Sequence, residues 1–363
     1  MFRITLRLAL CGLLAVALGF GAAAVDSLKA GKADLKSANA LAFGPEAVLF
    51  VGDSIGAAIF ALDTGDRTAS AAKPMNIAGL DQKIAAMLGV SPDQILIQDM
   101  AVNPISKKTY LAVSRGRGPD AMPVLLRVDT AGKIEEFSLD SVKLSKVALP
   151  NAPVSAVDKR GGNPRQDAIT DLAYVQGRVF VAGLSNEEFS SNLRSIPFPF
   201  AAVDKGTSVE IFHGSHGRWE TNSPVRTFVP YEIKAEANIL AAYTCTPLVK
   251  FPVSQLKPGT KVVGTTIAEM GNRNRPLDMV VYKKGGTDYL LMNNSSRGVM
   301  KMSLANVDSY KPITAPTETA GLPYETIASL KGVEQLDKLD DSNALLLLRG
   351  EGGSLDLKSI PLP

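Results

Sequence analysis

The chain has 363 residues, of which 45% are hydrophobic and 21% are charged, a balance typical of a globular protein rather than a disordered one. Its formal net charge of +3 comes without long basic runs, which argues against nucleic acid as a partner. Beyond the N-terminal segment, no apolar run reaches the length of about 18 residues that a membrane span needs.

The N-terminal segment has the pattern of a secretory signal peptide. Two arginines precede an apolar run from Leu8 to Phe20, and Ala22–Ala24 supply the small residues of a cleavage site. We therefore expect residues 1–24 to be removed and the mature protein to begin at Val25. Residues 25–363 would then form one domain in the periplasm or outside the cell.

A repeated unit runs through the rest of the chain. In each copy a polar residue opens a short apolar strand, a turn follows, and a second apolar strand comes next. Five copies are clear, and they are opened by Asn39, Asp99, Asp171, Asp278 and Gln335. The interval from Asp171 to Asp278 is nearly twice the others, so we expect a sixth, diverged copy over residues 225–243. Six units followed by further strand-like sequence predict an all-β fold, a single β-propeller of six four-stranded blades.

Three segments outside the repeat have their own interpretation. Residues 80–88 show helical periodicity between two glycines and predict one short helix. Residues 141–166 are rich in Pro, Gly, Asn and charge and predict a surface loop. The last copy ends after its third strand. We therefore expect a strand from Val25 to Leu35 to pair with residues 355–360 and close the ring, which would leave no exposed sheet edge.

This strand rhythm, over most of residues 25–363, resembles the blades of exported six-bladed propellers in the NHL and SMP-30/gluconolactonase-like group. The resemblance implies a propeller fold. The lactonase-type members hold a metal ion in the channel with Glu, Asn and Asp. Asp and Asn open blades in this chain, but no glutamate does, so the chain departs from the lactonase pattern.

The five openers form the first candidate site. Because the innermost strand of a propeller blade begins at the mouth of the central channel, we expect the openers to surround one axis. Their three carboxylates and two amides are suited to Ca²⁺ or to a small polar ligand. The alternative is structural, in which each opener bonds the backbone of a neighbouring blade. Arg273 and Arg275 are expected to overhang the same mouth, either as ligands for an anionic group or as solvated loop residues.

The second candidate site contains the two histidines of the chain, His213 and His216, with its one tryptophan nearby. Removal of Cys11 with the leader leaves Cys245 as the only thiol, so no internal disulfide can form. Imidazole and thiolate suit Zn²⁺ or Cu²⁺. We expect the two histidines to share a transition-metal ion, with Cys245 as a third ligand. The alternative is a structured surface loop and a buried, inert cysteine.

Two functions follow from these sites. The first is an exported binding or accessory protein that holds a small polar ligand or a metal ion at the channel mouth, with another exported protein as a further candidate partner. The second is a metal-dependent hydrolase of lactonase type, which needs an open coordination position and a poised water. Neither a Gly-x-Ser-x-Gly motif nor a P-loop is found in the sequence.

Overall fold

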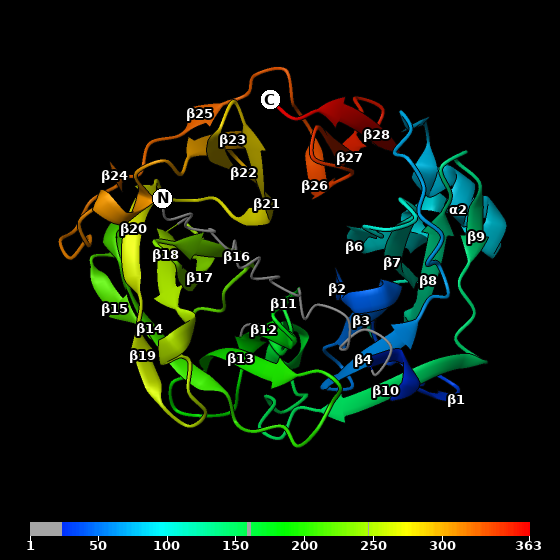
Figure 1. Ribbon diagram of the computed structural model, residues 1–363, viewed down its shortest axis with the longest axis horizontal. Helices are drawn as coiled ribbons and strands as arrows, with labels where there is room; N and C mark the ends of the chain where they lie inside the picture. The colour runs from blue at the N-terminus through cyan, green and yellow to red at the C-terminus, as the bar shows by residue number, and fades with distance from the viewer. Residues whose placement is uncertain (1–23, 158–160, 246) are drawn as a thin grey trace, which may run out of the picture.

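The computed structural model describes residues 24–157, 161–245 and 247–363, and these residues form six blades around a central opening (Figure 1). The expected all-β propeller is therefore confirmed. The expected leader lies almost wholly outside the described residues, and its removal before Val25 stays a prediction. Within the described residues, no helix is both long enough and apolar enough to cross a membrane.

Each blade is an antiparallel sheet, apart from β19, which pairs parallel to β14 in blade 3, and its innermost strand lies nearest the opening. Blade 1 contains β2 (Ala40–Phe43), β3 (Val48–Asp53), β4 (Ala58–Asp63) and β10 (Val142–Ala148), with β1 (Lys29–Gly31) beside β10. Blade 2 contains β6 (Ile95–Val102), β7 (Thr109–Arg115), β8 (Met122–Val128) and β9 (Ile134–Glu136). Blade 3 contains β11 (Asp171–Val175), β12 (Arg178–Leu184), β13 (Ser191–Pro197) and β14 (Thr207–His213), with β15 (Arg218–Glu220) and β19 (Lys261–Val263) paired to β14.

The second half of the chain supplies the other three blades. Blade 4 contains β16 (Thr227–Ile233), β17 (Glu236–Ala242), β18 (Pro247–Pro252), β20 (Thr265–Met270) and β24 (Thr319–Gly321). Blade 5 contains β21 (Pro276–Lys284), β22 (Thr287–Asn294), β23 (Gly298–Ser303) and β25 (Glu325–Thr326). Blade 6 contains β26 (Val333–Lys338), β27 (Asn343–Arg349), β28 (Leu355–Pro361) and β5 (Asn76–Ile77).

Helical structure is confined to short segments. The expected helix is present as α2 (Leu80–Leu88). Seven single turns of 3-10 helix join strands in the described residues: η1 (Pro45–Ala47), η2 (Pro92–Gln94), η3 (Gly118–Asp120), η4 (Pro164–Asp167), η5 (Gly214–His216), η6 (Val253–Gln255) and η7 (Val307–Ser309).

The hydrophobic core lies between the blades. The second strand of each blade is sandwiched between two neighbouring blades, so it is apolar on both faces and forms a continuous apolar run; residues 344–347 of β27 are fully buried. Leu49 and Val51 of blade 1, for example, share a cluster with Tyr110 and Leu125 of blade 2. Burial of these faces is the main contribution to holding the ring together.

The order of the blades around the ring differs from their order in the chain. Strand β2 contacts β6 on one side and β11 on the other, and β26 contacts β6 and β21. The ring therefore runs through blades 1, 2, 6, 5, 4 and 3 (Figure 1). After blade 2 the chain returns past blade 1 along β10 before it enters blade 3.

The prediction of a surface loop over residues 141–166 was wrong for its first part, because residues 142–148 form β10. This strand pairs with β4 on one side and β1 on the other. Val142 and Leu144 pack on the cluster between blades 1 and 2. Intervening lysine and serine side chains weakened the apolar signal of this half-exposed strand.

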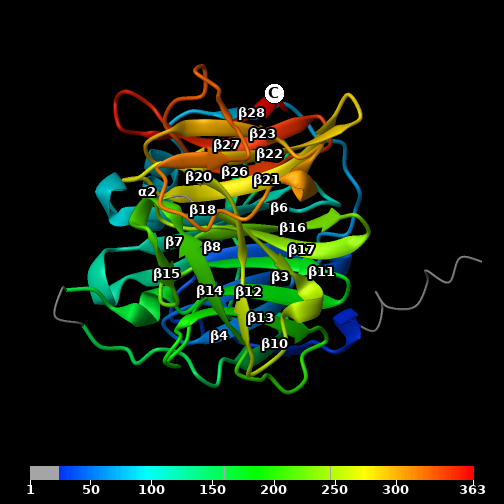
Figure 2. The same ribbon diagram turned by 90° about the vertical axis from the view of Figure 1, so that its left-hand side faces the viewer.

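The predicted closure was also wrong. The strand that completes blade 6 is β5, in which Ile77 pairs with Leu357 and Asn76 pairs with Lys358. Residues 29–31 pair instead with β10. Helix α2 follows β5 directly and covers the place where β5 pairs with β28, since its Leu80 and Ile84 share a cluster with Leu357. In the side view, β28 and β10 lie at opposite edges of the ring (Figure 2).

Engineered cysteines distinguish the two closures. In a background with Cys11→Ser and Cys245→Ser, the pair Asn76→Cys and Lys358→Cys should form a disulfide under mild oxidation. Opposed residues of an antiparallel pair lie about 4.5–5.5 Å apart at Cα, within disulfide range. Because the disulfide closes a long loop, it should raise Tm by roughly 5 °C.

The matched control is Lys29→Cys with Lys358→Cys in the same background. Lys29 pairs with Leu144 and not with β28, so this pair should stay reduced. Both outcomes are read by non-reducing electrophoresis and thiol titration. Efficient cross-linking of Lys29→Cys, with none at Asn76→Cys, would contradict the closure by β5.

Candidate functional site

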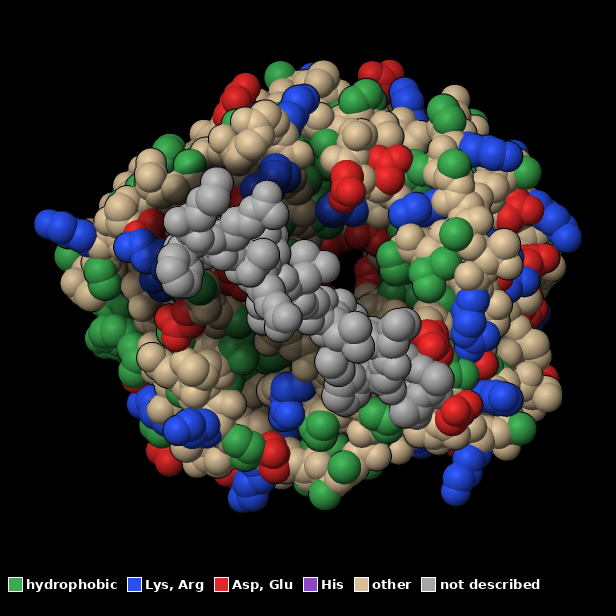
Figure 3. All heavy atoms as spheres, viewed as in Figure 1, with side chains coloured by type: hydrophobic (Ala, Val, Ile, Leu, Met, Phe, Trp, Pro, Cys, Tyr) green, Lys and Arg blue, Asp and Glu red, His purple; other side chains and the backbone are tan. Residues whose placement is uncertain are grey.

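A cavity of about 550 Å³ lies on the axis of the propeller. Its lining comes from the innermost strand of every blade: β2, β6, β11, β16, β21 and β26. Acidic side chains, coloured red, are visible inside the central opening in Figure 3. The cavity is therefore built by all six repeats, and its chemistry depends on what each innermost strand places at the axis.

Four of the lining residues are aspartates that are bonded in the same way. One carboxylate oxygen accepts the amide of the following residue, at 2.6–2.8 Å. The other accepts an amide from the innermost strand of a neighbouring blade, at 2.6–3.0 Å. The inter-blade pairs are Asp99 with Leu41, Asp171 with Phe228, Asp278 with Leu336, and Asp337 with Val102.

These inter-blade bonds all point the same way around the ring. They join blade 3 to 4, blade 5 to 6, blade 6 to 2 and blade 2 to 1. The structural alternative for the openers therefore applies to Asp99, Asp171 and Asp278, which lock neighbouring blades while they line the cavity.

The carboxylates are poorly solvated, which changes their acidity. Burial raises the pKa of Asp171 to about 7 and that of Asp337 to about 6. Burial, and then repulsion from the other channel aspartates, raises the pKa of Asp99 and of Asp278 well above the ordinary range. At neutral pH these four aspartates therefore carry fewer than four negative charges unless a cation compensates them.

The two amide openers have other roles. Gln335 donates from Nε2 to the carbonyl of Ile97 at 3.3 Å, and the carboxylate of blade 6 comes from Asp337, two residues later. Asn39 accepts the Ser37 hydroxyl at 2.6 Å and the Ser54 amide at 3.3 Å, just before β2 begins. Neither residue is part of the described cavity lining.

Arg273 and Arg275 also lie outside the described lining. Arg275 is close to Arg226, and burial together with the charge of Arg226 lowers its pKa. Arg226 forms an ion pair with Asp167 at 2.8 Å. Arg273 is exposed, and its carbonyl accepts the hydroxyl of Ser296. The arginines thus belong to loops at the N-terminal ends of the inner strands.

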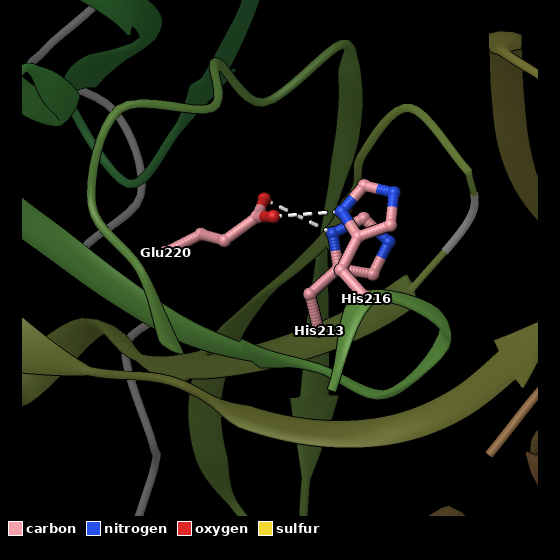
Figure 4. A group of neighbouring side chains, drawn as sticks. All are labelled: His213, His216 and Glu220. Atoms are coloured by element: carbon pink, nitrogen blue, oxygen red, sulfur yellow. Dashed lines mark hydrogen bonds and ion pairs between the residues drawn. The ribbon is translucent and has the colours of Figure 1, made fainter. Parts of the chain in front are cut away.

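The second candidate site lies at the turn between β14 and β15. His213 ends β14, η5 and Gly217 reverse the chain, and the imidazole of His216 stacks on that of His213 with centroids 3.8 Å apart. Both Nδ1 atoms face Glu220, at 3.0 Å from His213 and 2.7 Å from His216 (Figure 4).

Glu220 was not expected from the sequence, and Cys245 does not join the group. Histidine and carboxylate ligand atoms of His213, His216 and Glu220 lie within 4.8 Å of one another, a grouping that does not include Cys245. The thiol of Cys245 instead donates to Asn272 Oδ1 at 2.9 Å, in the loops between blades 4 and 5. Proximity in sequence had suggested a contact that the hairpin geometry does not produce.

The raised pKa values lead to a prediction about stability and pH. The unfolded chain releases its carboxyl protons near their ordinary pKa, whereas folded Asp171 holds its proton up to about pH 7. The stability from this group is fully present below the unfolded pKa and is lost as pH rises through the folded pKa. The Tm of the ligand-free protein should therefore fall between pH 5 and pH 8.

In Asp171→Asn this fall should be smaller by about 2–5 °C, because no proton is released at that position. Asp120→Asn, which alters an exposed carboxylate in η3, should leave the slope unchanged. Calorimetry across the pH range measures both. Identical slopes in the parent and in Asp171→Asn would rule out a raised pKa at Asp171.

Comparisons with known proteins give little beyond the fold. No family model matches the chain, and no curated protein matches it. Among solved structures, it is similar to a proposed oxidoreductase (glucose dehydrogenase) of Thermus thermophilus, with 13% identity, a TM-score of 0.37, and coverage of 92% of this chain and 100% of that one.

Two further solved structures are similar at the same low level. The PQQ-bound aldose sugar dehydrogenase of Streptomyces coelicolor shows 11% identity, a TM-score of 0.33, and coverage of 92% and 97%. An engineered GH43 glycoside hydrolase shows 12% identity and a TM-score of 0.36 over 74% of this chain; the chain spans about half (51%) of that protein. Values this low support no argument about function, and the likeness to the NHL and SMP-30 group stays a resemblance.

Proposed function

We propose that this chain is an exported ligand-binding protein whose central channel holds a small organic cation, such as an amine. The observation that carries the proposal is the set of four aspartates around one cavity of about 550 Å³. That volume is within the usual range for small-molecule sites. The predicted signal peptide supports a location in the periplasm or outside the cell.

The electrostatics of the cavity favour a positive ligand. Burial raises the pKa values of all four aspartates, because their ionised carboxylates lose solvation by water. A nearby cation stabilises the ionised form of each carboxylate. Each carboxylate oxygen accepts a backbone amide and keeps acceptor capacity for a ligand N–H. Burial raises the pKa of Asp337 less than it otherwise would, because the charges of Lys338 and Lys107 oppose the rise, and this leaves the other three aspartates as the principal attraction.

The walls of the cavity suit the apolar part of such a ligand. Leu41, Phe228 and Val280 line it together with the aspartates. A site with apolar walls and a few convergent charged groups is the usual design for binding a small molecule in a defined orientation. An ammonium group on a short hydrocarbon matches this combination better than a strongly hydrated inorganic ion does.

Direct calcium coordination is less well supported. Calcium needs several oxygens at about 2.3–2.6 Å, so its ligands must converge on one point. Among the described residues, three His, Cys, Asp or Glu ligand atoms come within 4.8 Å of one another at His213, His216 and Glu220, and not in the channel. We therefore favour binding over hydrolysis of lactonase type, which requires a metal in the channel.

Thermal-shift titration at pH 7.5 tests the proposal with 1,4-diaminobutane, choline and arginine as probes. At least one should raise the Tm of the parent protein by a few degrees, since a ligand that binds only the folded state stabilises it. The neutral analogue 1,4-butanediol should not. The shift should be lost in Asp171→Asn and in Asp278→Asn, and kept in Asp120→Asn.

Calorimetric titration near pH 7 adds a readout that fold stability does not affect. Because a cation favours the ionised carboxylates, its binding should release protons, and the measured enthalpy should vary with the ionisation enthalpy of the buffer. Shifts equal for diamine and diol, shifts retained in both aspartate variants, or no shift with any cationic probe would each overturn the proposal.

A further inference from the structure

We infer that the stacked imidazoles of His213 and His216 bind a divalent transition-metal ion of the zinc and copper class through their Nε2 atoms, with Glu220 as the residue that orients both rings. This site lies at the β14–β15 turn of blade 3 and is separate from the channel. It would bind a different kind of ligand from the one proposed there.

The hydrogen bonds of Glu220 determine which ring nitrogens are available. Glu220 accepts the hydroxyl of Ser223 and the guanidinium of Arg218, and its two carboxylate oxygens face the Nδ1 atoms of His213 and His216. An ionised carboxylate accepts hydrogen bonds and donates none. Both Nδ1 atoms must therefore carry the proton, and in the neutral rings the lone pairs are on Nε2.

The geometry brings these two lone pairs together. The rings are 3.8 Å apart at their centroids and tilted by 33°. With both Nδ1 atoms turned toward Glu220, the two remaining ring nitrogens lie on the same side of the pair (Figure 4). Zinc-bound imidazole nitrogens lie about 2.0–2.1 Å from the ion, so one ion can reach both nitrogens once the two rings turn toward a common point.

On this side of the two rings, one buried ring nitrogen has no hydrogen-bond partner among the described residues. His213 is 1% exposed, and its Nε2 has no hydrogen-bond partner within the described structure. Buried polar atoms are normally satisfied. Ser215 Oγ, in the same turn, and Glu269 Oε2, beside Gly214, are also buried without a described partner.

The arrangement matches the way proteins prepare histidine for a metal. A ligating imidazole commonly donates its second ring nitrogen to a carboxylate, which fixes the ring and raises its basicity. Glu220 does this for two rings at once, and it is itself held by Ser223 at 2.6 Å and Arg218 at 3.2 Å. The side chain of His216 is 33% exposed, which gives an ion a route from solvent.

The single tryptophan of the chain reports on this site. Trp219 lies between the two histidines and Glu220 in the hairpin sequence and packs on Phe212. We expect Cu²⁺ to quench its fluorescence with a stoichiometry of one, and Zn²⁺ to compete. The chain contains only these two histidines, so the substitution of one of them removes half of its imidazole side chains.

The decisive variant is His216→Gln, since His216 is partly exposed and its loss should not prevent folding. It should weaken Zn²⁺ and Cu²⁺ binding by at least about 100-fold, with Tm unchanged in the absence of metal. Glu220→Gln keeps both ligands but loses the ionised acceptor, and it should weaken binding by about 10–100-fold. Cys245→Ser is the matched control and should bind like the parent.

Three results would overturn the inference. They are parental binding in His216→Gln, loss of binding in Cys245→Ser, or no stoichiometric binding of Zn²⁺ or Cu²⁺ by the parent protein. Equilibrium dialysis with elemental analysis serves as the second measurement, so that quenching at another position is not mistaken for this site.

Discussion

The centre of the molecule depends on one interaction, a half-buried aspartate that accepts the backbone amide of the next blade. Hydrophobic contacts between blades are not directional and do not fix how far one innermost strand slides past another. The bonds from Asp99, Asp171, Asp278 and Asp337 are directional and set that offset at the axis. Because carboxylates form these four links, the channel becomes acidic. The ring geometry and the charge of the cavity are therefore one feature.

The same ring is also secured at its outer edge by strands that come from the chain segments of other blades, and two of these strands flank blade 2 in the sequence. The segment between blades 1 and 2 gives β5 to blade 6, and the segment after blade 2 gives β10 to blade 1. Blade 2 lies between blades 1 and 6 in the ring, so the chain on either side of blade 2 completes both of its neighbours. Neither neighbour has a full sheet without a strand from elsewhere in the chain. We expect these three blades to unfold as one unit.

The features that can be predicted from the sequence are those that repeat along the chain. Asp99, Asp171 and Asp278 recur at one position of a periodic unit, and their placement in the channel follows from the fold. Strand β5 has two residues and β10 is interrupted by lysines, so neither strand shows an alternation of apolar and polar residues that the sequence alone would reveal. Asp337 stands two residues beyond Gln335, where the other copies are apolar. Glu220 approaches the histidines only because Gly217 turns the hairpin, with a left-handed φ of 64°. The register of the two hairpin strands places Glu220 there, and residue composition does not reveal that register.

The carboxylates of the two candidate sites differ in how well they are solvated and hydrogen-bonded, and this difference determines what each site can bind. In the channel, backbone amides do not fully replace the lost water, and burial raises the pKa of the four aspartates that link the blades. A cation there gains by completing the solvation of the carboxylates. At the hairpin, two imidazoles, Ser223 and Arg218 already satisfy Glu220. His213 Nε2, by contrast, is buried without a described hydrogen-bond partner. Attraction in the channel therefore depends on charge, whereas attraction at the hairpin depends on coordination, so an amine and a transition metal would each select its own site.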